Sequence, residues 1–342
     1  MEQTKVTLAN IESQITAWLH EQSGSGNEVL IAEMIRTLIK LVRDGTSRGD
    51  LKILNRTLKE LRHAFKVFAP YDAVRKVSIF GSTHIQEHDP YYSLAKQLAD
   101  RLAREQFMVI TGAGPGIMQA GHEGAGPENS FGVNIRLPAV QPANRFIKGD
   151  TKLMNFHFFF TRKLMFVKEA DAVVIFPGGF GTHDELSEAL TLAQTGKSQI
   201  VPIVLMDLFD KKYWQQWEIF LREAMLTRGY ISGGEFSFFK IMDNVDAAVD
   251  EIKSFYRNFH SYRFVKQDLV IRLNHPPAPG LIDKLNQTFV DILKEGTITQ
   301  TDPLPEEGDD PDTLHLSRLS VPFNREDFAR LREMIDVINR DG

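Results

Sequence analysis

Three apolar stretches of this 342-residue chain run directly into glycine, and this feature constrains the fold more than any other part of the sequence. The stretches end in residues 80–83 (FGST), 111–118 (TGAGPGIM) and 176–185 (FPGGFGTHDE). Glycine lets backbone N–H groups approach a ligand without an intervening Cβ, and a following helix directs its unpaired N–H groups to the same place. The pattern therefore predicts strands whose ends bind an anion, most simply a phosphate.

The glycine segments lie in a region, residues 71–262, where short β-rich runs alternate with helical stretches. Nearly continuous apolar runs are typical of strands that are covered on both faces. Their alternation with helices predicts an α/β fold, a Rossmann-like doubly wound parallel sheet that binds ligands at the carboxyl ends of its strands. The expected strands are residues 74–80, 107–111, 131–137, 171–176 and 200–206.

Two regions flank this core. Residues 1–70 are predicted to form a helical extension of three amphipathic helices, whose apolar stripes indicate burial against the next domain or another subunit. The first of these helices carries Ile11, Ile15, Trp18 and Leu19. Residues 263–342 are predicted to form a small α+β appendage. Its expected parts are strands at 268–273 and 314–322, helices at 279–294 and 325–339, and an acidic, proline-containing loop at 301–311.

The composition excludes several classes of protein. The chain has no cysteine, so it has no disulfide framework, thiolate nucleophile or Cys-ligated metal. A formal net charge of −5 gives no support to a nucleic acid partner bound through bulk charge. Because the sequence lacks both a signal-peptide pattern and an apolar run long enough to span a bilayer, we expect a cytoplasmic protein with no membrane partner.

Two cofactor patterns and one metal pattern are incomplete. The 111–118 segment reads G-x-G-x-G, and the strand after it has no acidic residue for a ribose, so a dinucleotide fingerprint is absent. Residues 84–88 match H-x-x-E-H, but Asp89-Pro90 follows at once and places the pattern in a loop. Lys163 has no pyridoxal phosphate signature around it. We therefore expect neither a metal nor a cofactor.

A phenylalanine-rich stretch, residues 155–165, is predicted to be a mostly buried helix that carries Arg162, whereas Glu185 opens the helix after the third glycine segment. Both side chains could reach the same crevice. Alternatively, Arg162 forms a structural ion pair and Glu185 only favours the start of its helix. Asp184 and Glu188 are expected to be solvated or to pair locally.

Arg162-Lys163 and residues 177–185 together resemble the paired Arg-Lys and P-G-G-x-G-T-x-x-E motifs of the LOG family. These are nucleotide 5'-monophosphate phosphoribohydrolases, known for releasing cytokinins and often labelled "lysine decarboxylase". The other two glycine segments are similar to those of the family. The resemblance covers about residues 74–260, and larger bacterial relatives, the pyrimidine/purine nucleotide nucleosidases, also carry flanking domains.

The resemblance implies hydrolysis of the N-glycosidic bond of a nucleoside 5'-monophosphate, giving free base and ribose 5-phosphate. Glu185 would then stabilise the oxocarbenium-like charge on the ribose, orient water or hold ribose hydroxyls. Arg162 would steady Glu185 and the substrate, or polarise the leaving base. The 5'-phosphate would be held by Gly178, Gly179, Gly181 and Thr182, the last as N-cap or hydroxyl donor. The opposite wall would be formed by Gly114 and Gly116, with Ser82 and Met118 as candidates for contact with base and sugar.

The family resemblance also implies a homo-oligomer, at least a dimer. Met118 suits core packing about as well as base contact. A different class of function is a non-catalytic nucleotide or molybdenum-cofactor carrier that uses the same phosphate-binding loops; such a carrier does not require the Arg162 and Glu185 pair. A third alternative is a regulated enzyme that binds an effector nucleotide at a subunit interface.

Overall fold

The computed structural model describes residues 13–15, 17–18, 27–137 and 142–342, and the chain divides into two compact units, residues 1–59 and 60–342. The boundary lies inside helix α3 (Arg48–Phe68). The division into three domains at residues 70 and 262 stays a prediction. Within the described residues, none of the helices is both long and apolar enough to cross a membrane.

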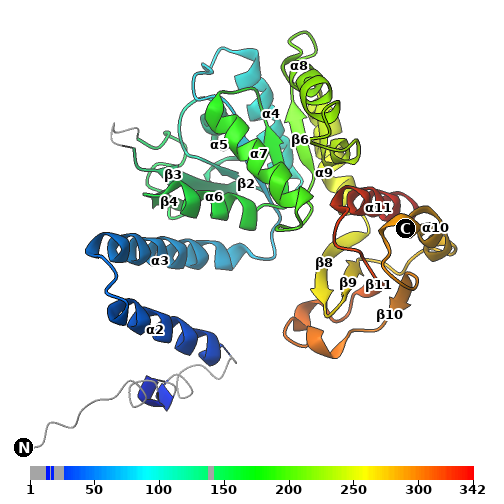
Figure 1. Ribbon diagram of the computed structural model, residues 1–342. Helices are drawn as coiled ribbons and strands as arrows, with labels where there is room; N and C mark the ends of the chain where they lie inside the picture. Colours follow the sequence, from blue (N-terminus) through cyan, green and yellow to red (C-terminus); the bar gives the residue numbers. More distant parts are fainter. Residues whose placement is uncertain (1–12, 16, 19–26, 138–141) are drawn as a thin grey trace, which may run out of the picture. The chain divides into compact units, whose positions relative to one another are not determined.

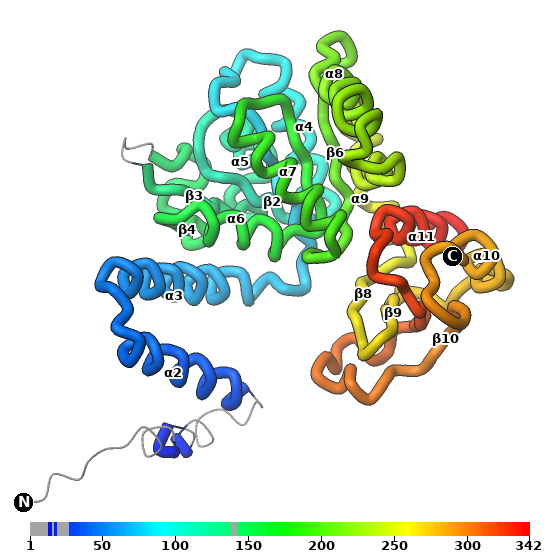
Figure 2. Tube along the Cα trace, in the orientation of Figure 1, coloured from blue at the N-terminus to red at the C-terminus, as the bar shows by residue number. Residues whose placement is uncertain are grey.

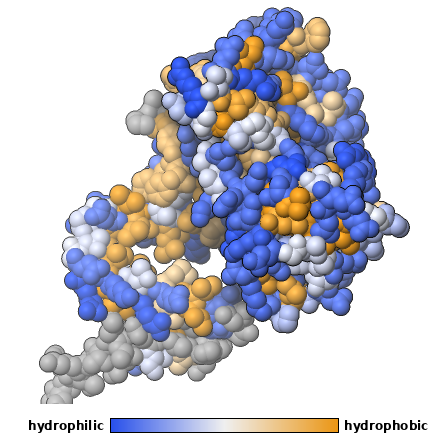
Figure 3. All heavy atoms as spheres, turned by 45° about the vertical axis from the view of Figure 1, so that its right-hand side comes forward, coloured by the Kyte–Doolittle hydropathy of each residue, from blue (hydrophilic) through white to orange (hydrophobic). Residues whose placement is uncertain are grey.

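Two of the three expected N-terminal helices are present, as α2 (Glu28–Arg43) and α3. Ile11 and Leu19 of the other expected helix lie outside the described residues. Apolar side chains on α2 and α3 are exposed, among them Leu38 at 48% and Leu58 at 52%, and Figure 3 shows apolar residues on this part of the surface. An oligomer that would cover them stays a prediction.

The first sheet of residues 60–342 has seven strands, all parallel, in the order β4-β3-β2-β1-β5-β6-β7 (Figure 1). Its strands are β1 (Lys76–Phe80), β2 (Met108–Thr111), β3 (Ser130–Ile135), β4 (Leu153–Phe156), β5 (Ala172–Ile175), β6 (Ile203–Met206) and β7 (Phe239–Met242). The five expected strands and the doubly wound α/β fold are therefore confirmed, and β4 and β7 are additional.

Helices cover both faces of this sheet, which agrees with its buried strands. One face is covered by α4 (Pro90–Arg104), α5 (Ile117–Ala125) and α9 (Val245–Phe255). The other face is covered by the end of α3 and by α6 (Phe159–Lys168), α7 (Phe180–Gln194) and α8 (Tyr213–Phe220). A π-helix (Leu221–Leu226) continues α8, and short 3₁₀ turns lie at Ala69–Tyr71, Pro127–Asn129, Gly234–Phe238, Val290–Ile292, Pro305–Glu307 and Pro311–Thr313.

The phenylalanine-rich segment differs from the prediction in two ways. Asn155 and Phe156 belong to β4, and Phe158 is still extended, so α6 begins only at Phe159. Phe159 and Phe160 are more than half exposed, whereas Phe166 is buried. The helix thus buries one side only, and the expectation that most of it is buried is wrong.

The strand order places the site. β2, β3 and β4 lie on one side of β1, and β5, β6 and β7 lie on the other, so the direction of winding reverses between β1 and β5. Parallel sheets bind ligands outside the carboxyl ends of the strands at such a point. The segments with Gly81 and Gly178 follow β1 and β5 respectively.

The second sheet is antiparallel, in the order β10-β11-β9-β8. It contains β8 (Phe259–Val265), β9 (Asp268–Leu273), β10 (Thr299–Thr301) and β11 (Ser317–Val321), and packs with α10 (Leu281–Thr288) and α11 (Phe328–Asp341). Figure 2 shows α11, the red end of the chain, returning beside α9. The side-chain oxygen of Asn339 on α11 accepts hydrogen bonds from the N–H groups of Asn258 and Phe259, at 2.9 and 2.8 Å.

The expected acidic loop at 301–311 is fixed by a buried carboxylate. Glu307 is fully buried and lies 2.8 Å from Nη2 of Arg272 and 2.9 Å from Nε of Arg318. Burial opposes its ionisation, but hydrogen bonds from Arg272, the Leu304 N–H and Arg318 hold the pKa of Glu307 below its ordinary value. The loop is therefore part of the folded appendage.

Candidate active site

A cavity of about 290 Å³ lies at the carboxyl ends of the central strands, close to the lower limit of common ligand sites of roughly 300 Å³. All three glycine segments contribute to it. Eight of the ten predicted site residues line it: Ser82, Gly114, Met118, Arg162, Gly179, Gly181, Thr182 and Glu185. Gly116 and Gly178 lie behind the wall.

Arg162 is a buried cation held at the edge of this cavity. Its Nε donates to the carbonyl of Val133 at 2.9 Å, and its guanidinium carbon lies 5.1 Å from the ring centroid of Phe166. Burial lowers the pKa of Arg162, and the negative charge of Glu185 opposes that shift. The guanidinium nitrogens that do not bond Val133 remain available to a ligand.

Glu185 lies in the second turn of α7, half-buried in the same cavity. Desolvation raises its pKa to about 7, and the charge of Arg162 opposes the shift. Within the part of the chain that the structure describes, Arg162 and Glu185 form no direct ion pair, although each acts on the pKa of the other. A carboxyl group with a pKa near neutrality in a cleft is typical of a catalytic group.

The N-terminus of α7 supplies N–H donors to the cavity. The first helical hydrogen bond runs from the His183 N–H to the Gly179 carbonyl, so the N–H groups of Phe180, Gly181 and Thr182 have no acceptor in the helix. Their partial positive charge stabilises an anion by about 0.3 to 1 kcal/mol, or up to about 2 kcal/mol when partly buried.

Thr182 is not the N-cap that the sequence suggests as one option. Gly179 occupies that position, and Thr182 lies in the first turn with its side chain packed on Gly178. A Cβ added to Gly178 would lie 2.1 Å from the Thr182 hydroxyl oxygen. The carbonyl of Gly178 accepts a hydrogen bond from the Tyr213 hydroxyl at 2.6 Å, and this bond holds the loop between β5 and α7 in place from the side away from the cavity.

Gly116 also serves packing. Its φ is +69°, and an added Cβ would lie 2.3 Å from the carbonyl oxygen of Ser82. This close contact joins the glycine loop after β2 to the loop after β1, while Ser82 and Gly114 themselves line the cavity.

Gly112 is a site residue that the sequence reasoning does not single out. A Cβ at this position would lie 2.3 Å from Nη2 of Arg162 and 2.5 Å from the sulfur of Met118. Gly112 therefore leaves the space that both side chains occupy. Asn134 and Phe159 also line the cavity. The signal for Gly112 is its place as the first residue after β2 in the second glycine segment.

A buried histidine supports the second glycine segment. The Asn144 side-chain amide donates to the carbonyl of Gly114 at 3.0 Å and lies 3.1 Å from Nδ1 of His122. Nε2 of His122 lies 3.1 Å from the carbonyl of Phe131. Burial lowers the pKa of His122 to about 4, so the ring is neutral near pH 7. A proton on Nε2 would satisfy both contacts.

A buried carboxylate supports α6 in the same way. Glu60 accepts hydrogen bonds from the His157 N–H at 2.9 Å and from the Thr161 hydroxyl at 2.7 Å. Thr161 directly precedes Arg162, so Glu60 fixes the first turn of the helix that carries it.

The acidic neighbours of Glu185 have a separate partner. Lys163 lies 2.7 Å from Asp184 and 3.3 Å from Glu188, and these ion pairs join α6 to α7. Local pairing of both carboxylates, as expected from the sequence, is therefore present. In the described ranges no group of three or more His, Asp or Glu side chains has an arrangement suited to a metal ion.

A family comparison covers the part of the chain that carries Arg162 and Glu185. Residues 115–252 match the family model described as "Possible lysine decarboxylase". A pyrimidine/purine nucleotide 5'-monophosphate nucleosidase of Escherichia coli strain K12 is 27% identical over 169 residues, which cover 46% of this chain and 36% of that protein. The probable cytokinin riboside 5'-monophosphate phosphoribohydrolase LOG6 of Arabidopsis thaliana is 30% identical over 128 residues, which cover 36% of this chain and 61% of that protein.

The matched part thus spans little more than a third of the length of the bacterial nucleosidase. Among solved structures, the molybdenum cofactor binding protein of Rippkaea orientalis is similar with a TM-score of 0.38 and 19% identity. That similarity covers 53% of this chain and 96% of the other.

Proposed function

We propose that the protein hydrolyses the N-glycosidic bond of nucleoside 5'-monophosphates. The proposal is supported by the match of residues 115–252 to the family described as "Possible lysine decarboxylase" and by the similarity to a nucleotide nucleosidase and a phosphoribohydrolase. The products would be a free base and ribose 5-phosphate. One observation carries the proposal: Arg162 and Glu185 line one cavity beside a helix N-terminus without neutralising each other in a direct ion pair.

The 5'-phosphate is proposed to bind at the N-terminus of α7. The free N–H groups of Phe180, Gly181 and Thr182 suit phosphate oxygens, and Gly179 and Gly181 leave space for them. This position directs the ribose of the substrate toward Glu185, which lies one turn further along the same helix.

Glu185 is proposed to act on the ribose. As the C1'–N bond breaks, positive charge develops on the sugar, and a nearby carboxylate stabilises that charge or orients the attacking water. The water oxygen forms the new bond to C1', and one water proton replaces the sugar on the base. A pKa of about 7 lets Glu185 hold or release a proton near neutral pH.

Arg162 is proposed to hold the Glu185 carboxylate by long-range attraction and to donate hydrogen bonds to the substrate. Its fixed position, bonded to Val133 and confined by Gly112, favours a preorganised donor. Ser82, Gly114 and Met118 line the remaining wall and are proposed to contact the ribose and the base.

The test is base release from a panel of ribo- and deoxyribonucleoside 5'-monophosphates, followed by chromatography. The Glu185→Gln and Arg162→Ala variants should each lower kcat/KM by about 10² to 10⁴-fold. Glu188→Gln is the matched control, since Glu188 lies on the same helix but pairs with Lys163, and it should retain most of the activity.

Full activity in both variants would contradict the mechanism. Tight binding of the monophosphates with no base released from any of them would contradict the enzyme and support the carrier alternative.

A further inference from the structure

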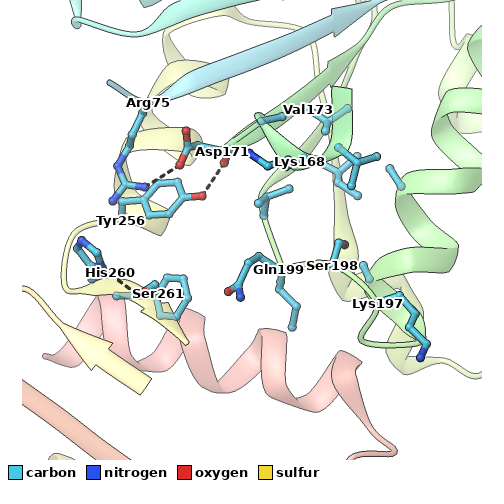
Figure 4. Close-up of a pocket in the computed structure, with 18 of the residues that line it drawn as sticks. Arg75, Lys168, Asp171, Val173, Lys197, Ser198, Gln199, Tyr256, His260 and Ser261 are labelled. Carbon is cyan, nitrogen blue, oxygen red and sulfur yellow. Dashed lines mark hydrogen bonds and ion pairs between the residues drawn. The ribbon is translucent and has the colours of Figure 1, made fainter. Parts of the chain in front are cut away.

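A second cavity, of about 450 Å³, lies at the opposite end of the parallel sheet (Figure 4). Arg75 and Asp171, which directly precede the first residues of the central strands, form its upper edge in this view, and β8 of the appendage lies below and to the left. The cavity is therefore bounded by both the catalytic core and the appendage. Nothing in the proposed reaction uses it.

One wall of this cavity is apolar. It is formed by Leu164 and Val167 of α6 and by Ala189 and Ala193 of α7. The two alanines leave space between the helices where larger side chains would close it. Ligand sites are commonly apolar cavities with a few polar groups that fix orientation.

The polar groups gather at another side of the cavity. Figure 4 shows Arg75, Tyr256 and His260 together, and the Arg75 guanidinium stacks on the Tyr256 ring at 3.5 Å from its centroid. Nη1 of Arg75 lies 3.2 Å from a carboxylate oxygen of Asp171. Asp171 accepts one hydrogen bond from this guanidinium, and the Tyr256 hydroxyl is also close enough for Arg75 to act on its pKa. Arg75 carries five N–H donors, so donors beyond these two contacts can face a ligand.

The remaining charges leave the cavity with a positive balance. Lys168 is neutralised by Glu169 at 2.6 Å, and Asp171 neutralises Arg75. Lys197, at the opposite side of the view, has no ion-pair partner among the described residues. An occupant with one negative charge would complement this arrangement.

We propose that this cavity binds a small organic monoanion, with its carboxylate on the Arg75 donors that Asp171 and Tyr256 leave unused and its apolar body against the wall formed by α6 and α7. The Ser261 hydroxyl and the His260 ring lie beside the carboxylate position as further hydrogen-bonding groups. Binding here does not require the proposed hydrolysis, since none of these residues lines the cavity at the carboxyl ends of the strands.

The probe is 2-naphthoate, compared with its neutral isostere 2-naphthamide by calorimetric titration of the full chain. The acid should bind at least about tenfold more tightly, as expected for a charge-assisted hydrogen bond. Arg75→Gln should remove that preference. Arg104→Gln is the matched control, because Arg104 also pairs with an aspartate, Asp100 at 3.0 Å, but lies elsewhere on the exposed surface.

A second variant tests the apolar wall. Ala189→Phe fills the space between α6 and α7 without changing any charge, and it should abolish binding of 2-naphthoate in a chain whose circular dichroism is unchanged. His260 gives a local readout: its pKa is lowered by burial and then by the charge of Arg75, and a bound carboxylate should raise it in an NMR titration.

Equal affinity for the acid and the amide would overturn the proposal, as would no binding of 2-naphthoate at millimolar concentration. Unchanged binding in a folded Ala189→Phe variant would overturn it as well. If that variant does not fold, unchanged binding in Arg75→Gln and an unmoved His260 titration decide against it. None of these results depends on base release, so failure here and failure of the hydrolase proposal are distinguishable.

Discussion

The two cavities at the two ends of the parallel sheet differ most in how their charges are paired. At the amino end, Arg75 is bonded to Asp171 and Lys168 to Glu169, and Lys197, which has no ion-pair partner within the described ranges, is exposed rather than buried. At the carboxyl end, Arg162 is buried and influences Glu185 only through space. Leaving a buried charge without a direct partner costs free energy, so such a charge marks a place where a ligand completes the pairing.

The two cavities also differ in the glycine content of their walls. Gly112, Gly114, Gly179 and Gly181 line the carboxyl-end cavity, whereas no glycine is among the residues that line the amino-end cavity. The first presents the unpaired N–H groups of the α7 N-terminus to a phosphate, whereas the second offers side-chain donors and an apolar wall. The smaller of the two cavities is therefore the better candidate for nucleotide chemistry, and volume alone would mislead.

The largest effect that would test this contrast is expected from Gly112→Ala. The new Cβ would meet Nη2 of Arg162 at 2.3 Å and displace the guanidinium. A misplacement of that order lowers kcat/KM by about 10²-fold. Base release by the purified variant measures it. Gly233→Ala is the control, since no atom lies within 4 Å of its added Cβ. Wild-type activity in Gly112→Ala would show that the position of Arg162 does not matter.

The next effect is a pH-dependent stability change in Glu185→Gln. The pKa of Glu185 is raised from 4.5 to about 7, so between these values the folded chain binds more protons here than the unfolded chain. The free energy of unfolding then falls as pH rises through this window. The variant has no proton to lose here, so its free energy of unfolding does not fall in this window. The difference in the free energy of unfolding, variant minus wild type, should therefore be about 1 to 3 kcal/mol larger at pH 8 than at pH 4.5.

Urea unfolding at the two pH values measures this change. Ser187→Ala is the control, because Ser187 is an exposed neighbour on α7 and its substitution removes no titratable group. A stability difference for Glu185→Gln that stays constant from pH 4.5 to pH 8 would contradict the raised pKa, and with it the claim that this charge is held without a direct partner.

The sequence predicted the parallel sheet well because the five expected strands are nearly continuous apolar runs and three of them, β1, β2 and β5, lead into glycine segments. It missed β4, where the four residues Leu153–Phe156 run into a phenylalanine-rich helix with no turn residue between them. The predicted domain boundary at residue 262 falls within β8, and it stays a prediction. The hairpin from β8 to β9 turns at Lys266, which has φ of +54°, a conformation that a glycine or asparagine would have signalled.

The candidate site was predicted to the extent that local motifs determine it. Arg162, Glu185 and the α7 N-terminus meet because each lies beside a strand end. Gly116 and Gly178 are needed because a Cβ would clash with another part of the folded chain, whereas Gly114 and Gly181 line the cavity. The sequence cannot distinguish these two roles, because it does not show which residues pack against each glycine. Long-range supports such as Glu60 have no local signal at all.

A smaller effect is expected from His122, a positioning residue behind the second glycine segment. His122→Phe removes both ring nitrogens and leaves the Asn144 amide without one partner, so the loop at Gly114 relaxes. We expect kcat/KM to fall by about fivefold to tenfold, the cost of one buried hydrogen bond. His122→Gln should restore part of this loss by supplying a donor, and exposed His88→Phe should have no effect. A lowered melting temperature with unchanged kcat/KM would reduce His122 to a purely structural role.

The smallest effect would connect the two cavities. α6 carries Arg162 at one end and Val167 at the other, and α7 likewise carries Glu185 and Ala193, so the same two helices line both sites. Lys163 joins them through Asp184 and Glu188. An apolar body bound between the helices should therefore alter the separation of Arg162 and Glu185, and saturating 2-naphthoate should lower kcat/KM by about twofold to fivefold.

Arg75→Gln should abolish this inhibition without changing the rate in the absence of the probe. Inhibition that persists in Arg75→Gln would mean that the probe acts at the carboxyl-end cavity, and the two ends of the sheet would then be independent.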